Sequence, residues 1–491
     1  MAVVQRSDPR NIHSEVEAMA TYYVDSNATG LNSGTSWTDA WTSIQSSDGS
    51  ATTGGDVVLV ASDHDEQVTG NIYAQYSGGV ANNPVQVIST NKSTGAYEKG
   101  ASLRAINGNY DIFLDGNVRV QGLICSPTRY NYLANNITYA VNEYEDCDFQ
   151  IDSTSGAGNR RMYIGSNNSY NSVKFRNCKF DFTYASSSSQ FALHMHRDVS
   201  PVRFESCEFV GHSTMTSIFN TAGGNGHHSL LKFSGCKFTT TNSSTKLASI
   251  SAEYRGEYIL DGCEIPSQWA TSCLNTTAKR SEFNVEIYNS FYGTLTNPAV
   301  PVFLKESHYG KVMGNTSVYR SSGASDGTTN YSLELATNSD AQEINNPVCT
   351  NQISKYVEAG SQTITLYLAS SASLSNDDFW VEVYSPSEES SATARSKYRS
   401  TCCQRLATPA ALTSDTSSWT GSGVGTVQKV EVAIAPTVAG TVTVSAFLAK
   451  PSTTVYVDPK ISTDGSQKGF NGVIVDGEKT QTTAPAFHPL G

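Results

Sequence analysis

A short hydrophobic motif recurs along the first two thirds of the chain. Each copy places a large hydrophobic residue three positions before a cysteine and a second hydrophobic residue two positions after it. The clearest copies surround Cys147, Cys178, Cys207, Cys236 and Cys263, which follow one another at spacings of 31, 29, 29 and 27 residues. A near-constant period in this range is typical of repeat architectures, in which each repeat is one structural unit.

The same period extends beyond these five cysteines. Upstream, the segment LICS places Cys125 in the equivalent position, and downstream Ser290 and Asn315 continue the series. Cysteine fits this position as a small buried apolar residue, and a redox or metal role is the minor alternative. We therefore predict a structural ladder of stacked, reduced cysteines: Cys125, Cys147, Cys178, Cys207, Cys236 and Cys263.

Within a repeat, hydrophobic and polar residues alternate with a period of two. Phe175 and Phe180, for example, are separated from the next hydrophobic positions by charged residues. Segments with the same alternation fall midway between successive cysteines, among them residues 161–166, 191–196, 216–221 and 248–253. This period is typical of β-strands and excludes helical repeats, so two or three strands are expected per repeat.

Together the repeats predict an all-β parallel β-helix. A unit of about 27 residues cannot bury its inward face alone, whereas coiling successive units buries one continuous interior and pairs each strand with its equivalent in the next coil. Each coil then advances about 4.8 Å, the spacing of paired strands. We assign residues 55–349 to this helix.

Residues 19–54 are expected to cover the open N-terminal end of the β-helix, because exposed strand edges invite aggregation. Trp37, Ala40, Trp41 and Ile44 are spaced three and four residues apart and follow a Ser or Thr cap. This spacing predicts one amphipathic capping helix, with Trp37 and Trp41 as the end cap.

A polar turn precedes that segment. Asp25, Asn27 and Gly30 resemble the start of a calcium loop, but Ser36 stands where such a loop requires Glu. A plain turn is therefore the favoured interpretation.

After residue 350 the cysteine period stops and longer alternating segments begin. Residues 362–369, 378–385, 427–435 and 440–449 each alternate over eight or more positions, which predicts an antiparallel β-sandwich spanning residues 350–461. Residues 462–491 form an extended tail without a core of their own, and residues 1–18 form an N-terminal arm. Such an arm orders only against a partner surface, so we expect it to contact a shell or a neighbouring subunit.

The charge pattern narrows the possible partners. The chain has 33 basic and 45 acidic side chains, a net charge of -12, and no run of Lys or Arg. The charge pattern therefore predicts that nucleic acid is not a partner of this chain. No apolar stretch reaches 18 residues, and the N-terminal 19 residues lack the apolar core of a signal peptide, which predicts no membrane-spanning helix and synthesis in a cytoplasm. None of the ten cysteines forms a C-x-x-C pair, so no metal or cofactor is predicted.

Three features together resemble a known family. The opening YYVDSNATGLNSGTSW, the F-x-x-C-x-F coils and the terminal VYVDPKI are similar to the right-handed parallel β-helix proteins of tailed bacteriophages, the tailspike-like virion proteins. The resemblance implies a homotrimer that either decorates and cements a capsid or binds and cuts bacterial glycans. The fold also occurs in pectate-lyase-like enzymes, but no signature of theirs is present, and no catalytic residue is carried over.

A glycan groove is the main alternative site of chemistry. Glycoside hydrolysis needs two carboxylates about 5 to 10 Å apart, and a lyase needs a base with a neutralising cation. If the strands align as expected, side chains of this kind come from neighbouring coils: His194, His196, Glu253, Arg255, Lys305 and Glu306. Solvated side chains on a strand face remain the stronger interpretation, since H-x-H without a third ligand is weak evidence for zinc.

Two acidic clusters have the same pair of interpretations. Glu143, Glu145, Asp146 and Asp148 flank one cysteine, and alternate members face opposite sides of a strand. A second cluster at residues 63–66 follows the strand VVLVAS. A solvated face for the first and a turn for the second are favoured over an acid/base pair.

The resulting prediction is a non-enzymatic, homotrimeric virion protein that decorates a phage capsid and contacts the major capsid protein or another virion protein. The alternative is a tailspike or fibre that binds or depolymerises a host surface polysaccharide. In both cases the protein is located in the virion and requires no cofactor.

Overall fold

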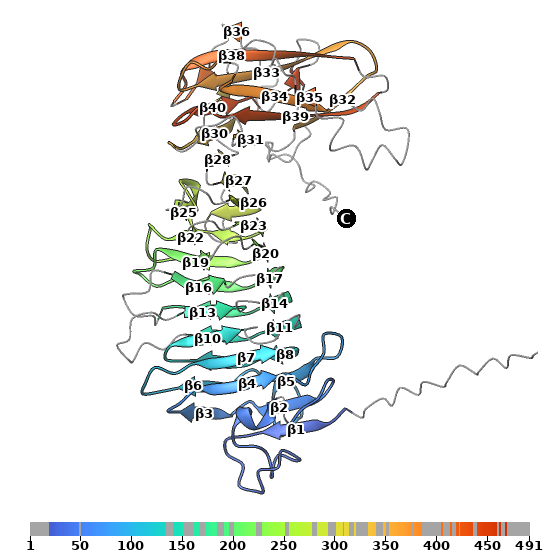
Figure 1. Cartoon of the computed structure of the whole chain (residues 1–491), viewed down its shortest axis with the longest axis vertical. Coiled ribbons are helices and arrows are strands. Elements are labelled where there is room, and N and C mark those ends of the chain that lie inside the picture. The colour runs from blue at the N-terminus through green and yellow to red at the C-terminus, as the bar shows by residue number, and fades with distance from the viewer. Residues whose placement is uncertain are drawn as a thin grey trace, which may run out of the picture.

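The computed structural model is an all-β molecule whose N-terminal part is a coiled rod (Figure 1). In the described residues every regular element is a β-strand, apart from two short 3₁₀ helices, η1 (Ile44–Ser47) and η2 (Ser267–Ala270). The structure describes the following residues: 19–48, 51–133, 141–150, 161–165, 172–183, 191–195, 201–221, 228–250, 255–276, 282–292, 301–307, 309–313, 319–320, 332–339, 347–349, 353–375, 377–384, 404–405, 413–414, 419–421, 423–435, 439–458, 461–462 and 467–468.

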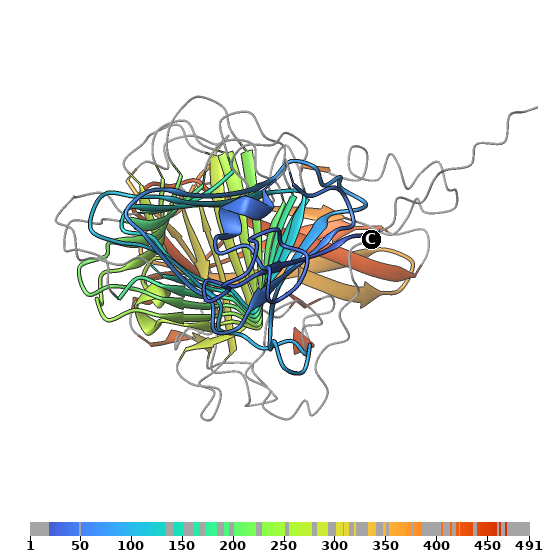
Figure 2. The same cartoon turned by 90° about the horizontal axis from the view of Figure 1, so that it is seen from below.

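Parallel strands form three columns along the rod, and a typical coil contributes one strand to each (Figures 1 and 2). The first column is β1 (Thr21–Val24), β2 (Val57–Ala61), β5 (Val85–Thr90), β8 (Val118–Gln121), β11 (Val141–Glu145), β14 (Ser172–Arg176), β17 (Val202–Glu205), β20 (His228–Ser234), β23 (Arg255–Asp261) and β26 (Glu282–Tyr292). The second column is β3 (Asp65–Val68), β6 (Ser102–Ala105), β9 (Ile124–Ser126), β12 (Asp148–Gln150), β15 (Lys179–Asp181), β18 (Glu208–Val210), β21 (Lys237–Thr239) and β24 (Glu264–Ile265). The third column is β4 (Ile72–Tyr76), β7 (Ile112–Gly116), β10 (Tyr130–Leu133), β13 (Arg161–Ile164), β16 (Phe191–Met195), β19 (Ser217–Thr221), β22 (Lys246–Ile250) and β25 (Leu274–Thr276). The predicted parallel β-helix is thus confirmed, with three strands per coil.

A single left-handed residue makes the bend between the first and second columns in most coils. These residues are Asp146, Asn177, Ser206, Gly235 and Gly262, with φ angles of 52°, 52°, 54°, 61° and 63°. Gly, Asn and Asp adopt this conformation at lower cost than other residues. At this bend the backbone N–H of Asn177 donates to Glu205 O on the next coil, at 2.8 Å. The bend therefore keeps its backbone hydrogen bond to the next coil. Its left-handed conformation also explains why Asp, Asn, Ser or Gly directly precedes each cysteine.

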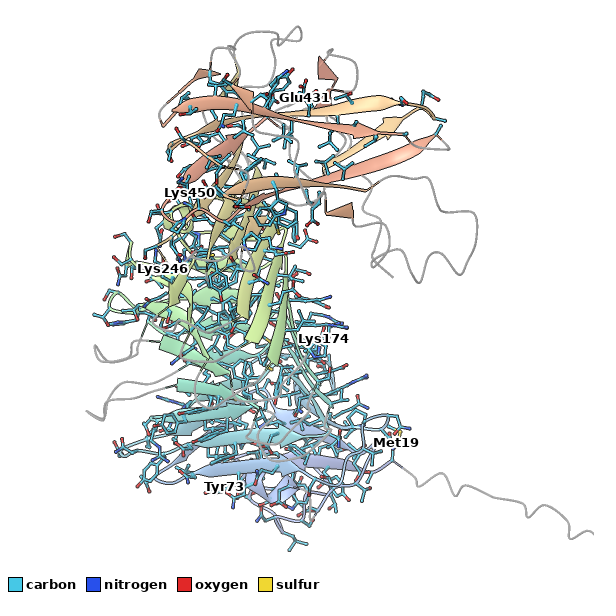
Figure 3. The ribbon with its side chains drawn as sticks, turned by 45° about the horizontal axis from the view of Figure 1, so that its top comes forward. Met19, Tyr73, Lys174, Lys246, Glu431 and Lys450 are labelled. Carbon is cyan, nitrogen blue, oxygen red and sulfur yellow. The ribbon has the colours of Figure 1, made fainter. Side chains whose placement is uncertain are left out.

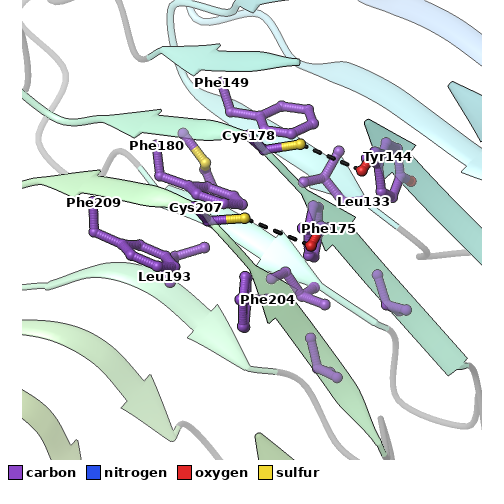
Figure 4. Packing of buried hydrophobic residues seen from close by; sticks show 14 of the residues in the cluster. Leu133, Tyr144, Phe149, Phe175, Cys178, Phe180, Leu193, Phe204, Cys207 and Phe209 are labelled. Carbon is purple, nitrogen blue, oxygen red and sulfur yellow. Dashed lines mark hydrogen bonds between the residues drawn. The ribbon is translucent and has the colours of Figure 1, made fainter. Parts of the chain in front are cut away.

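Aromatic rings of the same kind stack on one another inside the rod (Figure 4). In the first column, Phe204 lies parallel to Phe175 and Phe233, with ring centroids 5.0 and 4.9 Å away. In the second column, Phe209 stacks between Phe180 and Phe238 at 4.9 and 4.8 Å. All of these rings are almost fully buried. Parallel register therefore turns the repeated Phe positions into two continuous stacks.

The cysteines occupy the inner position next to the bend, with one correction to the predicted ladder. The N–H groups of Lys179, Glu208, Lys237 and Glu264 donate to the carbonyls of Cys147, Cys178, Cys207 and Cys236, each on the preceding coil. Cys125, however, pairs with Phe149 in the register of β9 and β12, and Leu123 takes the position below Cys147. In the coil of Cys125 the bend precedes the cysteine by two more residues than it does in the later coils. The assignment of Cys125 to the ladder was therefore wrong.

Each ladder thiol lies close to a backbone carbonyl of the preceding coil. Cys178 Sγ donates to Tyr144 O at 3.4 Å, and Cys207 Sγ donates to Phe175 O at 3.6 Å (Figure 4). Burial raises the pKa of the Cys178 thiol far above its usual value, so the S–H form is retained. All cysteines in the described residues are free. Cysteine thus supplies a weak hydrogen-bond donor for a backbone carbonyl of the preceding coil.

The N-terminal end is closed by a loop, and the predicted capping helix is wrong. Trp41 N–H donates to Tyr23 O, and Asp25 N–H donates to Trp41 O, so this segment is extended against β1. Gly34 N–H likewise donates to Asp39 O within the loop. Because these backbone N–H and C=O groups are bonded to other partners, they are not available for the i to i−4 hydrogen bonds of a helix.

Both tryptophans nevertheless contact the first rung. Trp41 is 9% exposed and stacks on Tyr22 at 5.0 Å, and Trp37 meets Tyr23 edge-on at 4.9 Å. A Cβ at Gly34, whose φ is 73°, would lie 2.5 Å from the Trp41 indole. Gly34 is therefore required for the close packing of Trp41 under the rod.

A buried polar cluster ties this loop to β3. Glu66, 6% exposed, accepts hydrogen bonds from Ser43 Oγ at 2.6 Å and from Ile44 N–H at 2.8 Å, and lies 3.2 Å from His64 Nε2. His64 Nδ1 accepts from Ser26 N–H at 2.8 Å. Burial alone would raise the pKa of Glu66, but the bonds from His64, Ser43 and Ile44 outweigh burial and lower it. Residues 63–66 are thus a turn followed by the start of β3, with two buried side chains that anchor the cap.

The polar turn at Asp25 is held by protein groups. Asp25 Oδ1 accepts from Asn27 N–H at 2.9 Å, and Asp25 Oδ2 accepts from Lys92 Nζ at 2.8 Å. Over the described ranges, no group of three or more His, Cys, Asp or Glu residues is arranged to hold a metal ion.

Parallel pairing stops at β26, because β27 (Pro301–Ser307) pairs with it antiparallel. The same sheet then continues through further antiparallel strands: β28 (Gly310–Met313), β30 (Leu333–Thr337), β40 (Thr454–Val457), β33 (Gln362–Ser370), β38 (Thr426–Ile434), β36 (Thr413–Ser414), β41 (Ile461–Ser462) and β42 (Gln467–Lys468). One hydrogen-bonded sheet therefore runs from the rod into the C-terminal part.

A second antiparallel sheet lies against this continuation. It contains β31 (Val348–Cys349), β32 (Ile353–Val357), β34 (Phe379–Tyr384), β35 (Gln404–Arg405) and β39 (Gly440–Leu448), while β29 (Tyr319–Arg320) pairs with β37 (Trp419–Thr420). Leu335, Leu366 and Leu448 belong to a core that is separate from that of the rod. The range 55–349 expected for the β-helix thus contains parallel coils and antiparallel strands, and the bounds of the five predicted segments stay predictions.

The ring stacks should dominate the stability of the rod. We expect Phe204→Ala to lower the free energy of unfolding by about 3–5 kcal/mol, since two stacked neighbours lose their partner and a cavity remains. Cys207→Ala should cost only about 1–2 kcal/mol, because little volume and one weak hydrogen bond are lost. Guanidinium unfolding followed by circular dichroism measures both, and equal costs for the two variants would contradict this account.

The cap should weaken in acid. Because folding lowers the pKa of Glu66 below its ordinary value of 4.5, the carboxylate stabilises the fold above that value, and this contribution is lost as the pH falls through the folded pKa. The protection factors of residues 43–47 in hydrogen exchange, which correct for the intrinsic pH dependence of the exchange rate, should therefore fall between about pH 5 and about pH 3. Glu66→Gln should exchange faster already at neutral pH and lose this dependence. The exposed neighbour Asp65→Asn serves as the control and should behave like the unaltered chain.

Candidate functional site

The structure separates the residues predicted to line a glycan groove. His194 lies on β16 of the third column, in register with Tyr163 and Asn220. Arg255 begins β23 of the first column, in register with His228 and Glu282. The third-column residue that follows Asn220 is Ser249. His194 and Arg255 therefore lie on different columns, while His196 and Glu253 fall outside the described residues.

Lys305 and Glu306 are neighbours on β27, and each is engaged by the end of the rod. Lys305 Nζ forms an ion pair with Glu286 Oε1 at 2.9 Å. Glu306, 7% exposed, accepts from Ser272 Oγ and from Cys273 N–H, both at 2.5 Å. Cys273 directly precedes β25, the last strand of the third column in the described chain, so Glu306 supplies the acceptor that a further coil would otherwise provide. These two side chains close the rod.

The acidic cluster around Cys147 forms ion pairs between coils. Glu143 pairs with Arg119 at 2.7 Å, and Glu145 lies 3.7 Å from Arg176. Asp146 and Asp148 both contact Lys99, at 3.2 and 2.8 Å. Each carboxylate thus has a cation from another strand or loop. This arrangement supports the strand-face interpretation over an acid/base pair.

The most distinctive surface feature is a row of aromatic side chains on the outer face of the third column. Tyr73, Phe113, Tyr132 and Tyr163 lie on β4, β7, β10 and β13 and are paired in register. Their ring centroids are 4.8, 4.5 and 5.0 Å apart, and the ring planes differ by 12°, 6° and 13°. We call these four residues the aromatic row.

The aromatic row is accessible from solvent. The residues adjacent in sequence, such as Leu114, Leu133 and Ile164, point inward and are fully buried. Tyr73 is 38% exposed and the other three rings are half-buried. Figure 3 labels Tyr73 near the N-terminal end of the rod, on the side opposite Lys174. Rings that could have been buried inside the rod thus face water.

A fixed arginine flanks the aromatic row. Arg129 donates through Nε to Asp111 Oδ1 at 2.7 Å and through Nη2 to Asp111 Oδ2, and its guanidinium carbon lies 4.9 Å from the centre of the Tyr130 ring. The hydrogen bonds to Asp111 raise the pKa of Arg129, which keeps it charged. Tyr130 in turn contacts Tyr132 and Tyr163 edge-on at 5.7 and 5.1 Å. The arginine and the rings form one connected cluster.

Burial raises the pKa of Tyr132 well above its ordinary value, with a further contribution from Asp111. Its hydroxyl therefore stays protonated at neutral pH and can both donate and accept a hydrogen bond. The register position of the row continues along the column with His194, Asn220, Ser249 and Asn275. The column thus begins aromatic and becomes polar towards the C-terminal end of the rod.

Sequence reasoning missed the aromatic row. Each member follows an inward-facing residue in a short alternating segment, as in IYAQY at 72–76 and YNYL at 130–133. Tyr is common in strands of every kind, so the residues alone gave no reason to align them. An alignment of the third-column segments with one another would have revealed the row.

Comparisons with known proteins return phage proteins of low similarity. No family model matches the chain, and no curated protein matches it by sequence. A search of solved structures returns the enzymatically active domain of tailspike protein 4 of bacteriophage CBA120, with 9% identity, a TM-score of 0.24, and coverage of 84% of this chain and 64% of that one.

Two further structures are tailspikes of Acinetobacter phages. Tailspike protein gp49 of the Acinetobacter baumannii bacteriophage Fri1, described as a capsular polysaccharide depolymerase, is 12% identical with a TM-score of 0.20, and coverage is 82% of each chain. The tailspike protein of Acinetobacter phage vB_ApiP_P1 is 9% identical with a TM-score of 0.23, and coverage is 81% of this chain and 82% of that one. At such low TM-scores these likenesses carry no argument about function, and the fold assignment rests on the strand register. Within the described residues, no helix is long and apolar enough to span a membrane.

Proposed function

We propose that this chain is a tailspike-like virion protein that binds a bacterial surface polysaccharide along the outer face of the third column. The observation that carries the proposal is the aromatic row, four stacked rings that face solvent. Aromatic residues with a polar tip suit ligands that are partly apolar and partly hydrogen-bonding, as sugars are. This is the alternative of the two functions expected from the sequence.

The geometry of the row suits a chain-like ligand. Three intervals of about 4.8 Å make the row about 14 Å long and parallel to the rod axis. Because the ring faces cover one another, the row presents ring edges to a ligand. The rings are held by backbone register, so little side-chain freedom is lost on binding.

We propose binding rather than cleavage. Among the described candidates, His194 and Arg255 lie on different columns, and Glu306 is buried against β25. Among the described residues of this candidate groove no two carboxylates are brought together, as the acid and base of a hydrolase would be. Capsid decoration, the function first expected from the sequence, has no supporting observation in the described residues, and the arm at residues 1–18 lies outside them.

Removing a ring from the middle of the row should weaken binding. Tyr132→Ala should reduce affinity for the recognised polysaccharide about tenfold, equivalent to about 1.4 kcal/mol, since two stacked neighbours and one hydroxyl are lost. Surface polysaccharides purified from a panel of bacteria and immobilised on a sensor provide the measurement.

The matched control is Tyr97→Ala, because Tyr97 is similarly exposed at 41% but lies away from the row. It should leave affinity unchanged. Equal losses for the two variants, or no affinity for any polysaccharide in the panel, would contradict the proposed function. Circular dichroism checks that both variants are folded.

The expected homotrimer is a separate prediction. Native mass spectrometry should give three times the chain mass of 52.7 kDa. A monomer that persists over a wide range of concentrations would exclude it.

A further inference from the structure

Charges on the outer face of the first column follow an alternating pattern from coil to coil. Arg119, Glu143 and Lys174 occupy one register position on three successive strands. Arg119 pairs with Glu143 at 2.7 Å, and Lys174 pairs with Glu205 at 2.9 Å. Opposite charges one coil apart stabilise the register, whereas like charges there repel.

Neighbouring positions obey the same rule. Two residues further along the strands, Glu145, Arg176 and Glu205 alternate, with Arg176 at 3.7 and 3.4 Å from the two carboxylates. On the second column the successive residues are Asp148, Lys179, Glu208 and Lys237. Alternation is thus the general property of this side of the rod.

The alternation fails at one place. Arg203 and Lys232 follow Lys174 in the same register position, so three cations succeed one another. The side chains of Arg203 and Lys232 are exposed. Within the described part of the chain neither side chain has a hydrogen bond or an ion pair. The next residue in the series is Ile259, which brings no charge.

This exception has a physical cost, because among the described residues only Lys174 of the three cations has an acidic partner. Like charges one rung apart repel each other. An acidic residue at position 203 would continue the pattern and pair with both neighbours. Local violations of an otherwise consistent pattern are expected where a surface serves a ligand.

We propose that Arg203 and Lys232 form a binding site for an anionic polysaccharide. A guanidinium and an ammonium one rung apart can hold the same carboxylate or sulfate group, the guanidinium through two parallel hydrogen bonds. Ser234, exposed and two residues after Lys232, adds a hydroxyl. The site lies on the first column and does not depend on the aromatic row of the third.

The surroundings favour a polymer over a second copy of the chain. Stable protein interfaces contain an apolar, desolvated centre. Around Arg203 and Lys232 the outward positions carry Lys174, Glu205 and Ser234, and the two apolar neighbours, Leu230 and Ile259, are only partly exposed and form no continuous apolar centre. A small polar site of this kind fits single acidic groups spaced along a flexible chain.

The test uses the full chain and three probes: polygalacturonate, dextran sulfate and neutral dextran of similar length. At least one acidic polymer should bind, and neutral dextran should not. The double variant Arg203→Gln with Lys232→Gln should bind that polymer about tenfold more weakly and show a smaller dependence on salt. The matched control removes two cations of the same side that already have partners, Arg119→Gln with Lys237→Gln, and should retain the affinity.

Four outcomes would overturn the proposal. They are no binding of either acidic polymer, equal loss in the control, binding of inorganic phosphate without any binding of the polymers, and a change of native mass in the Arg203/Lys232 variant, which would indicate an interface between copies. Tyr132→Ala should keep its affinity for the acidic polymer, so failure of this site and failure of the proposed function are distinguishable.

Discussion

The structure depends on the rung-to-rung register of parallel strands. Because paired strands lie about 4.8 Å apart, equivalent residues of successive coils are forced into contact, and each side chain must be compatible with a neighbour of its own kind. Phenylalanine meets this condition as a flat ring, as Phe175, Phe204 and Phe233 show. Cysteine meets it at the bend, where its thiol reaches a carbonyl of the coil below. The interior therefore contains runs of like residues that stack on one another over several coils.

The same register also organises the outer surface. Inside the rod it aligns rings that exclude water, whereas outside it aligns groups that remain accessible, namely the aromatic row on the third column and the alternating charges on the first. Backbone hydrogen bonds fix these rows, so a ligand meets a surface that is ordered before binding. The rows run parallel to the rod, and the two proposed binding sites occupy separate columns. The fold thus provides elongated surfaces parallel to the rod axis.

Both ends of the rod need special solutions, because a coil at the end lacks a neighbour on one side. At the N-terminal end a loop covers the first rung, and the buried carboxylate of Glu66 holds that loop through Ser43 and Ile44. At the other end β27 reverses direction, and Glu306 accepts the hydrogen bonds that a further coil would take. In both places a buried carboxylate replaces missing backbone acceptors. The antiparallel sheet then extends the rod without a break in hydrogen bonding.

The sequence by itself determined the repeat, the strand character and the parallel β-helix, because the cysteine period and the two-residue alternation are local properties of the chain. It misplaced Cys125 by two positions and predicted a helix around Trp41, because the position of a bend and the partners of backbone N–H groups depend on segments distant in sequence. Tertiary structure alone brought Tyr73, Phe113, Tyr132 and Tyr163 into one row, and it separated His194 from Arg255. The physical reason is that loop lengths differ between coils, so equal spacing in sequence does not mean equal register, and only hydrogen-bonded strands define which side chains meet.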